Sequence, residues 1–203
     1  MAKIIINGGK TLSGEVNISG AKNAVLPIMS ATILCPGKFS IHNVQDLRDT
    51  RTMMQLLEIT GAKTSFENGT VRVDTNDVNN PEAPYDLVKT MRASFYVLGP
   101  LISRFGKVQV SLPGGCAWGP RPVDYHLKGL EKLGANLKLE GGNILAECDE
   151  LIGCDIYFEF PSVGATGNLA MAAVRAKGTT IIKAKKSRNH TELLCCLLYT
   201  SPS

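Results

Sequence analysis

The sequence predicts an α/β fold built from a repeated unit of helix, strand, helix, strand, turn and strand. Clusters of small residues at 20–24, 91–95 and 163–167 each open an apolar stretch with helical spacing, and a glycine and a β-rich segment follow each stretch. Gly134 and Gly142 follow Gly61 and Gly69 at one constant spacing. A fixed spacing of turn glycines indicates a structural repeat.

The pattern predicts five helices, at residues 22–35, 47–60, 87–104, 122–133 and 163–177, with strands between them. Two units are complete, and the third stops after its first strand. A single unit cannot bury both of its helices, so we expect the units to pack helix against helix with the sheets outside. Chance resemblance between ordinary α/β segments is the alternative.

Composition narrows the classes of function. The 203 residues carry a net charge of +4, with 44% hydrophobic and 20% charged residues, and no lysine- or arginine-rich run suggests nucleic acid binding. No apolar stretch is long enough to cross a membrane. The six cysteines form no C-x-x-C pair, and no metal or nucleotide-binding motif is present. We therefore expect a cytoplasmic protein with reduced thiols, without a metal or other cofactor, and with no nucleic acid or membrane partner.

A loop at residues 112–124 is the strongest candidate for chemistry. It holds three glycines and three prolines and lies between a predicted strand and a predicted helix, whose first turn Pro122 suits. Cys116 is expected to be exposed on this loop, near Arg121 and a helix N-terminus. Both features favour a thiolate and lower the pKa of a cysteine. An unreactive loop cysteine is the alternative.

Basic residues at helix starts are the second candidates. Lys22 and Arg92 occupy similar places in their units, and Arg121 precedes a third helix. A cation beside the free N–H groups of a helix N-terminus favours phosphate or carboxylate, so three such starts facing one cleft would suit a phosphorylated substrate. Ser162 suits a helix cap. His126 is predicted to be a polar surface residue.

Five motifs, in order, make the chain similar to the UDP-N-acetylglucosamine 1-carboxyvinyltransferase family over about residues 3–185. They are Ser19-Gly20-Ala21-Lys22-Asn23-Ala24-Val25-Leu26-Pro27, Thr90-Met91-Arg92-Ala93-Ser94, Leu112-Pro113-Gly114-Gly115-Cys116, Arg121-Pro122-Val123-Asp124 and Ser162-Val163-Gly164-Ala165-Thr166. The resemblance covers the N-terminal half of family members. It implies an inside-out α/β barrel of repeated βαβαββ units, here two full repeats and a partial third.

The resemblance also implies a domain division and an activity. Residues 1–19 would be strands that belong to the other domain in the family, residues 20–185 an incomplete repeat domain, and residues 186–203 a divergent tail. The family enzyme transfers the enolpyruvyl group of phosphoenolpyruvate to the 3′-hydroxyl of UDP-N-acetylglucosamine and releases phosphate, the first committed step of peptidoglycan synthesis. The two small-molecule substrates are the partners that it implies.

Site residues follow from the resemblance position by position. Cys116 would be the general acid toward the enolpyruvyl methylene. Lys22, Asn23 and Arg121 would bind phosphoenolpyruvate. Residues that would bind UDP-N-acetylglucosamine are Arg92, Arg121, Pro122, Val123, Asp124, Tyr125, Ser162, Val163 and Gly164.

Two departures from the family pattern affect these expectations. The chain has about half the family length, and the general base and an arginine that clamps phosphoenolpyruvate would lie in the other half, so we expect an inactive fragment. The segment 188–192 resembles a motif of the shikimate-pathway relative, and residues 195–203 resemble translated sequencing-adapter read-through. A non-catalytic UDP-sugar-binding domain and a 3-phosphoshikimate 1-carboxyvinyltransferase relative are the alternatives.

Overall fold

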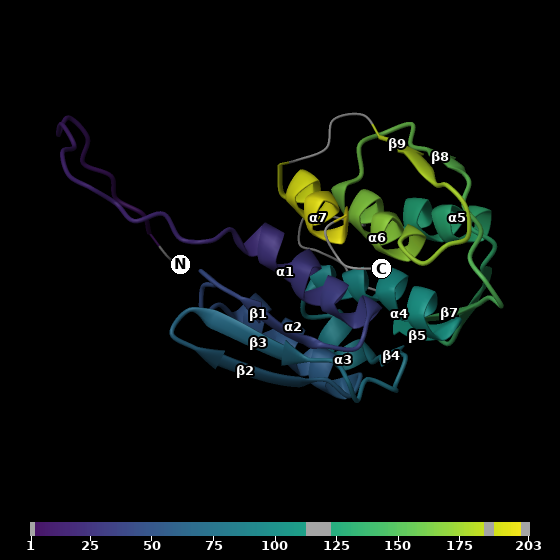
Figure 1. The fold of residues 1–203 in the computed structure, drawn as a ribbon. Coiled ribbons are helices and arrows are strands. Elements are labelled where there is room, and N and C mark those ends of the chain that lie inside the picture. The colour runs from purple at the N-terminus through teal and green to yellow at the C-terminus, as the bar shows by residue number, and fades with distance from the viewer. Residues whose placement is uncertain (1–2, 113–122, 185–188, 200–203) are drawn as a thin grey trace.

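The units expected from the sequence are visible in the computed structural model, which describes residues 3–112, 123–184 and 189–199 (Figure 1). Strands in these residues form three sheets, with the orders β1-β3-β2, β4-β5-β7-β6 and β8-β9. The sheets lie around a central group of helices (Figure 1). The predicted α/β arrangement, with helices inside and sheets outside, is confirmed.

The first unit packs two helices against an antiparallel sheet. Its elements are α1 (Lys22–Ala31), the 3₁₀-helix η1 (Thr32–Leu34), β1 (Lys38–Ile41), α2 (Arg48–Ile59), β2 (Lys63–Glu67) and β3 (Thr70–Asp74). Strand β3 pairs with both neighbours, so that Asp74 lies opposite Lys38 in β1 and Lys63 in β2. Alternation along β3 buries Val71 and Val73, which gives the sheet one face toward the helices.

The second unit repeats this order of strands. Its elements are β4 (Glu82–Ala83), α3 (Tyr85–Val88), the 3₁₀-helix η2 (Arg92–Val97), α4 (Leu98–Phe105), β5 (Lys107–Ser111), α5 (Asp124–Lys132), β6 (Asn136–Glu140) and β7 (Asn143–Glu147). Strand β7 lies between β5 and β6 and is antiparallel to both, as β3 is to β1 and β2. Strand β4 adds a parallel partner to β5. The common strand order confirms the repeat.

The third unit is shorter in the described residues. Its elements are β8 (Asp155–Tyr157), α6 (Val163–Ala173), β9 (Ile181–Lys183) and α7 (Asn189–Tyr199). Strands β8 and β9 pair in parallel, with α6 as their connection.

Both complete units end their second helix with the same backbone motif. Gly61 follows α2 with φ of 102°, and Gly134 follows α5 with φ of 100°. In each case the next N–H reaches back five residues, from Ala62 to the carbonyl of Leu57 at 3.1 Å and from Ala135 to the carbonyl of Leu130 at 3.0 Å. These are Schellman caps, which need a left-handed residue and favour glycine there. They explain the constant glycine spacing in the sequence.

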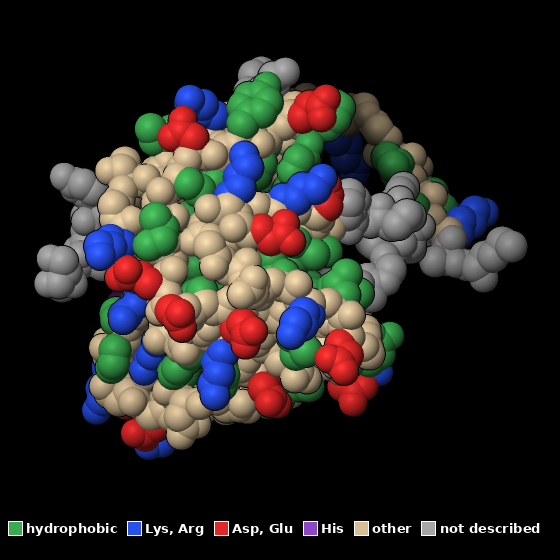
Figure 2. Space-filling view, turned by 90° about the vertical axis from the view of Figure 1, so that its right-hand side faces the viewer, with side chains coloured by type: hydrophobic (Ala, Val, Ile, Leu, Met, Phe, Trp, Pro, Cys, Tyr) green, Lys and Arg blue, Asp and Glu red, His purple; other side chains and the backbone are tan. Residues whose placement is uncertain are grey.

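Helices α1, α4 and α6 supply the centre of the core, and α4 and α6 approach most closely at Gly99. A Cβ atom on Gly99 would lie 2.2 Å from the backbone oxygen of Asn168 in α6. Only glycine allows this approach. On the face of the molecule drawn in Figure 2, basic and acidic side chains are interspersed with scattered apolar ones, as is usual for a solvent-exposed surface.

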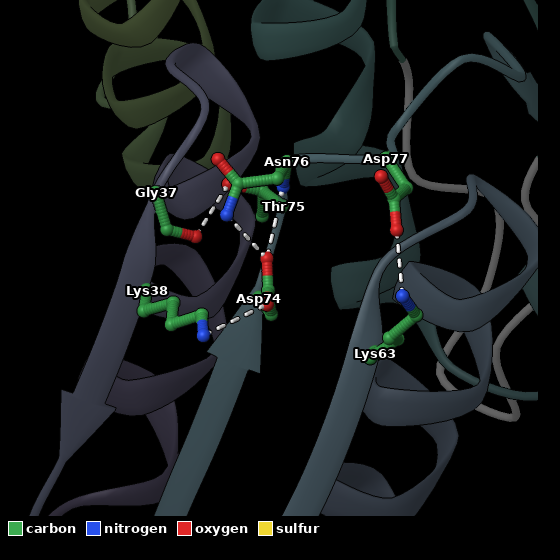
Figure 3. Close-up of polar contacts among 7 residues, drawn as sticks. All are labelled: Gly37, Lys38, Lys63, Asp74, Thr75, Asn76 and Asp77. Carbon is green, nitrogen blue, oxygen red and sulfur yellow. Dashed lines mark hydrogen bonds and ion pairs between the residues drawn. The ribbon is translucent and has the colours of Figure 1, made fainter.

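The loop after β3 ties the first unit together (Figure 3). The hydroxyl of Thr75 donates to the carbonyl oxygens of Cys35 at 2.8 Å and Gly37 at 3.3 Å. The Asp74 carboxylate accepts the backbone N–H of Asn76 at 3.1 Å, and this bond lowers the pKa of Asp74.

Arg104 in α4 joins the second unit to this loop. Its guanidinium donates to the carbonyl oxygens of Ile33 at 2.9 Å and Thr75 at 3.2 Å. Hydrogen bonds from a charged group to backbone carbonyls contribute more to stability than bonds between neutral groups. The two units are therefore connected by polar bonds as well as by the apolar core.

The helix predicted at 87–104 is wrong as one continuous element. It is divided into α3, η2 and α4. Met91, between α3 and η2, has an extended backbone, and Pro100 has no N–H to donate to the carbonyl of residue 96 at the junction of η2 and α4. The helix predicted at 163–177 ends at Ala173, before the left-handed Gly178. The other helices match their predicted ranges within a few residues.

Two terminal segments differ from the sequence-based expectation. Residues 3–19 form neither a helix nor a strand, because no neighbouring strand pairs with them in the described structure, and Ile4 and Ile6 are more than 80% exposed. The assignment of this segment to another domain stays a prediction. The divergent tail contributes α7, whose Leu194 is buried against Leu34 and Met171.

Replacement of Gly99 tests the helix contact at the centre of the fold. We expect Gly99→Ala to lower the free energy of unfolding by about 1–3 kcal/mol, because the new methyl group meets both the α6 backbone and the side-chain oxygen of Asn168. Urea unfolding followed by circular dichroism measures the change. Gly8→Ala is the control, since nothing lies within 4 Å of a Cβ at Gly8. Equal stability of the two variants would contradict the proposed contact.

Candidate functional site

A cavity of about 450 Å³ lies where the helix starts of all three units meet. This volume is in the range of small-molecule sites. The residues that line it are Asn23, Leu26, Arg92, Ala93, Phe95, Tyr96, His126, Pro161, Ser162, Val163 and Gly164.

The cavity brings together five of the residues predicted from the sequence. Asn23 lies in the first turn of α1, Arg92 begins η2, and Ser162, Val163 and Gly164 form the start of α6. These positions are far apart in the sequence but equivalent in the repeat. Of the three basic residues expected to face one cleft, Arg92 lines this cavity, and the binding roles of all the predicted site residues stay predictions.

The start of α6 combines a serine cap with N–H groups that have no partner within the helix. Ser162 caps the helix, since its hydroxyl accepts the backbone N–H of Ala165 at 3.3 Å. The Thr166 hydroxyl donates back to the carbonyl of Ser162 at 2.8 Å, which holds the turn. The first N–H groups of a helix have no partner within the helix, and with the helix dipole they attract a negative charge.

His126 is the main residue that the sequence-based analysis placed wrongly. It was expected on the surface, but its side chain is 4% exposed and lies edge-on to the Phe95 ring, with centroids 4.9 Å apart. Burial, together with the smaller effect of the nearby positive charge of Arg92, lowers its pKa to about 3. The imidazole is therefore neutral at physiological pH.

A signal in the sequence could have located His126. In α5 the residues Val123, His126, Leu127, Leu130 and Leu133 have the spacing of one helix face. All of the others are apolar. A histidine within an apolar stripe is more consistent with a buried side chain than with a surface one.

The other walls combine aromatic surface with positive charge. Burial raises the pKa of Tyr96, and Arg92 opposes this shift. Among the lining residues that the structure describes, none is acidic. A guanidinium, a helix start and amide and imidazole groups together suit a ligand with several anionic or neutral acceptor oxygens.

Lys22 lies at the start of α1 but does not line this cavity. Its ammonium group is 2.7 Å from a carboxylate oxygen of Asp49 in α2, and both side chains are partly exposed. The ion pair directs Lys22 toward α2, and its predicted role in binding phosphoenolpyruvate remains untested. Asp49 was not identified from the sequence.

The residues at the start of α5 lie beside the cavity rather than in its wall. Val123 packs against the core, and Asp124 forms an ion pair with Lys128 at 3.7 Å. The Tyr125 hydroxyl accepts the backbone N–H of Phe160 at 3.2 Å. Their predicted contacts with a nucleotide sugar stay predictions.

Three predicted site residues, Cys116, Arg121 and Pro122, lie outside the described residues. Of the other cysteines, Cys35 is exposed, while Cys148 and Cys154 are partly buried. Burial raises the pKa of both Cys148 and Cys154.

The described residues show neither a cluster of metal ligands nor a helix that could span a membrane. They contain no group of three or more His, Cys, Asp or Glu side chains placed to hold a metal ion. None of their helices combines the length and the apolar character needed to span a membrane.

Relatives with curated names resemble the chain over almost its whole length. It is 53% identical to the UDP-N-acetylglucosamine 1-carboxyvinyltransferase of Chlorobaculum parvum, over 98% of this chain and 47% of the relative. It is 55% identical to the enzyme of the same name from Chloroherpeton thalassium, over 90% of this chain and 43% of the relative. The chain thus spans about half the length of these relatives.

Solved structures support the fold. The enolpyruvyl transferase NikO from Streptomyces tendae matches with a TM-score of 0.81 at 22% identity, over 95% of this chain and 45% of that one. An EPSP synthase from Acinetobacter baumannii matches with a TM-score of 0.68 at 17% identity, over 88% of this chain and 42% of that one. Identities this low show a common fold alone.

The family model of EPSP synthase (3-phosphoshikimate 1-carboxyvinyltransferase) matches residues 6–198, which include every described element except the last residue of α7. The repeat of strands and helices, the meeting of helix starts in one cavity and the curated relatives agree with this match. The chain therefore belongs to the enolpyruvyl (carboxyvinyl) transferase family.

Proposed function

We propose that this chain forms part of an enzyme that transfers the enolpyruvyl group of phosphoenolpyruvate to the 3′-hydroxyl of UDP-N-acetylglucosamine and releases phosphate. The main supporting observation is that Arg92 and the start of α6 line one cavity suited to an anionic ligand. The names and identities of the curated relatives favour the nucleotide sugar as that ligand. The reaction would be the first committed step of peptidoglycan synthesis.

The family resemblance implies a role for each binding residue, and the charges of the described ones are compatible with it. Arg92 and the N–H groups at Ser162–Gly164 would bind the nucleotide sugar, with the diphosphate near the helix start. Asn23 would lie beside phosphoenolpyruvate, whose phosphate Lys22 and Arg121 would hold. For Lys22 this requires exchange of the Asp49 carboxylate for the phosphate. The ion pair is partly exposed, so breaking it costs little.

The proposed chemistry needs one proton donor and one proton acceptor. Cys116 would donate a proton to the methylene carbon of phosphoenolpyruvate, while the sugar hydroxyl adds to the adjacent carbon and loses its proton to a base. Loss of phosphate and of a methyl proton then restores the double bond. The donor, the base and the cations must each be placed accurately around the substrates, since a misplacement of about an ångström can cost roughly a hundredfold in rate.

Binding by the 203-residue chain is the direct test of the proposed site. We expect isothermal titration to detect UDP-N-acetylglucosamine, and Arg92→Ala to weaken its binding by about tenfold to a hundredfold, because a charged hydrogen-bond donor is lost. Arg72→Ala, which removes an exposed arginine of β3 paired with Glu67, is the matched control. Equal affinity of the Arg92 variant, or equal loss in the control, would contradict the site.

The same titration separates the proposal from its alternatives. Preference for shikimate 3-phosphate over the nucleotide sugar would favour the shikimate relative. Since the relatives are about twice as long, we propose that this chain binds the sugar without steady phosphate release in an assay containing both substrates. Steady release would show that the chain catalyses alone.

Cys116 should be the thiol that reacts first with iodoacetamide at neutral pH. Its predicted neighbours, Arg121 and a helix start, favour the thiolate. Burial raises the pKa of Cys148 and Cys154 and disfavours their reaction. Peptide mass spectrometry after brief labelling identifies the modified residue, and Cys116→Ser provides the control. First labelling of exposed Cys35 would contradict the assignment.

The neutral state of His126 can be tested through stability. Its pKa of about 3 in the fold lies below the ordinary value of 6.5, so as the pH falls the histidine of the unfolded chain is protonated before that of the folded chain. The stabilisation is complete above about pH 6.5 and is lost as the pH falls toward 3. When the pH is lowered from about 7.5 to about 5, the free energy of unfolding should fall by about 2 kcal/mol more for the native chain than for His126→Gln. Urea unfolding at the two pH values measures this difference. Equal pH dependence of the two proteins would show that His126 is not held neutral.

A further inference from the structure

Asn168 is a buried amide in the second turn of α6, behind the wall of the cavity. It is 1% exposed, and it makes three hydrogen bonds to groups from other helices. Its side-chain oxygen accepts the backbone N–H of Gly99 at 2.5 Å. Its side-chain nitrogen lies 2.8 Å from the carbonyl oxygen of Phe95 and 3.0 Å from Nδ1 of His126.

These partners determine which way the amide points. The Gly99 N–H can only donate and the Phe95 carbonyl can only accept, so exchange of the amide oxygen and nitrogen would face donor with donor and acceptor with acceptor. The Asn168 nitrogen therefore donates its second hydrogen toward His126. Nδ1 of His126 must accept it, and this ring nitrogen carries no proton.

The remaining ring nitrogen of His126 lies toward the cavity. A Cβ atom built on Gly164 would be 3.3 Å from Nε2 and 3.4 Å from Cε1 of His126, and Gly164 lines the cavity. In a neutral imidazole whose Nδ1 accepts, the proton is on Nε2. This N–H therefore lies next to the start of α6, where the backbone also offers donors.

We propose that Asn168 is a positioning residue that holds His126 as the neutral Nε2–H tautomer, so that the cavity offers an imidazole N–H donor to an acceptor oxygen of the bound ligand. The identity of that ligand as a nucleotide diphosphate sugar rests on the proposed function. The tautomer itself does not. This N–H donor would act together with the N–H groups of α6. Because the imidazole is neutral, it would bring no charge to the site, and ligand binding would take up no proton.

Two features of the fold support a positioning role. Asn168 is held from both sides by the backbone of η2 and α4, so it has no freedom to follow a change in the histidine. His126 is in turn fixed against the Phe95 ring. A rigid second residue that sets the tautomer of a histidine is a general way to orient its free N–H.

The decisive measurement is the ¹⁵N NMR spectrum of the histidine rings in the unliganded 203-residue chain. Long-range ¹H–¹⁵N correlations distinguish a protonated ring nitrogen from an unprotonated one, and His126→Gln identifies the His126 signals. We expect Nδ1 unprotonated and Nε2 protonated at neutral pH. A protonated Nδ1 in the native chain would overturn the proposal without any need for a folded variant.

Asn168→Asp should reverse the arrangement at a site of nearly the same shape, with loss of the bond to the Phe95 carbonyl. One carboxylate oxygen can still accept from Gly99, but the other accepts where the amide donated, so we expect Nδ1 of His126 to become protonated. UDP-N-acetylglucosamine should then bind about tenfold more weakly if the tautomer matters to the ligand. Exposed His42, which lies 3.2 Å from the Thr70 hydroxyl, serves as an internal reference whose signals should not move.

Asn143→Asp is the matched control for this substitution. Asn143 accepts from the Ser111 hydroxyl at 2.5 Å in the outer sheet, and its change should leave both the His126 signals and sugar binding as they are. Unchanged binding by Asn168→Asp after a confirmed tautomer change would overturn the positioning role. No sugar binding by the native chain with the expected tautomer would instead reject the proposed function and leave the assignment of Asn168 as a tautomer-holding residue supported.

Discussion

The close approach of α4 to α6 at Gly99 is the constraint on which the rest of the structure depends. No side chain fits between Gly99 and the backbone of Asn168. Because the helices touch at this depth, η2 and the start of α6 lie side by side, and their first turns form two walls of one cavity. The sheets can then cover the helices from outside. A larger residue at this contact would separate the units and change the shape of the cavity.

Repetition brings a common local feature together in one candidate site. One helix start attracts an anion weakly. Here the equivalent starts of three units meet, and each unit adds a different side chain: Asn23 from the first, Arg92 from the second and Ser162 from the third. The site therefore combines donors of different geometry on a single framework. Because each unit contributes its own side chain, a substitution in one unit can change the site without disturbing the backbone of the other units.

Much of the fold could be predicted from the sequence, because turn glycines and apolar periodicity are local signals. Gly61 and Gly134 marked the repeat since both occupy the same left-handed cap. The divided helix before α4 was missed because the effect of Pro100 on its preceding turn was not considered. In the site, Arg92 and Ser162 carried local signals, whereas Asn23 was named only through the family resemblance. The apolar stripe of α5 pointed to a buried His126, but its bond to Asn168 depends on how α5 and α6 pack, which no local pattern reveals.

Strand β5 has a parallel partner in β4, and β9 has one in β8, but β1 has no parallel partner within the described residues. Strand β1 thus forms an edge of its sheet, with β3 on one side only. Backbone groups along its open side exchange hydrogen bonds with water rather than with a neighbouring strand. Amide protons that point outward from β1 should consequently be among the least protected from deuterium in any strand of the first unit, whereas Gln109 in β5 is shielded by its bond to the carbonyl of Pro81. The equivalent strands β1 and β5 therefore differ in how readily their backbone amide protons exchange with solvent.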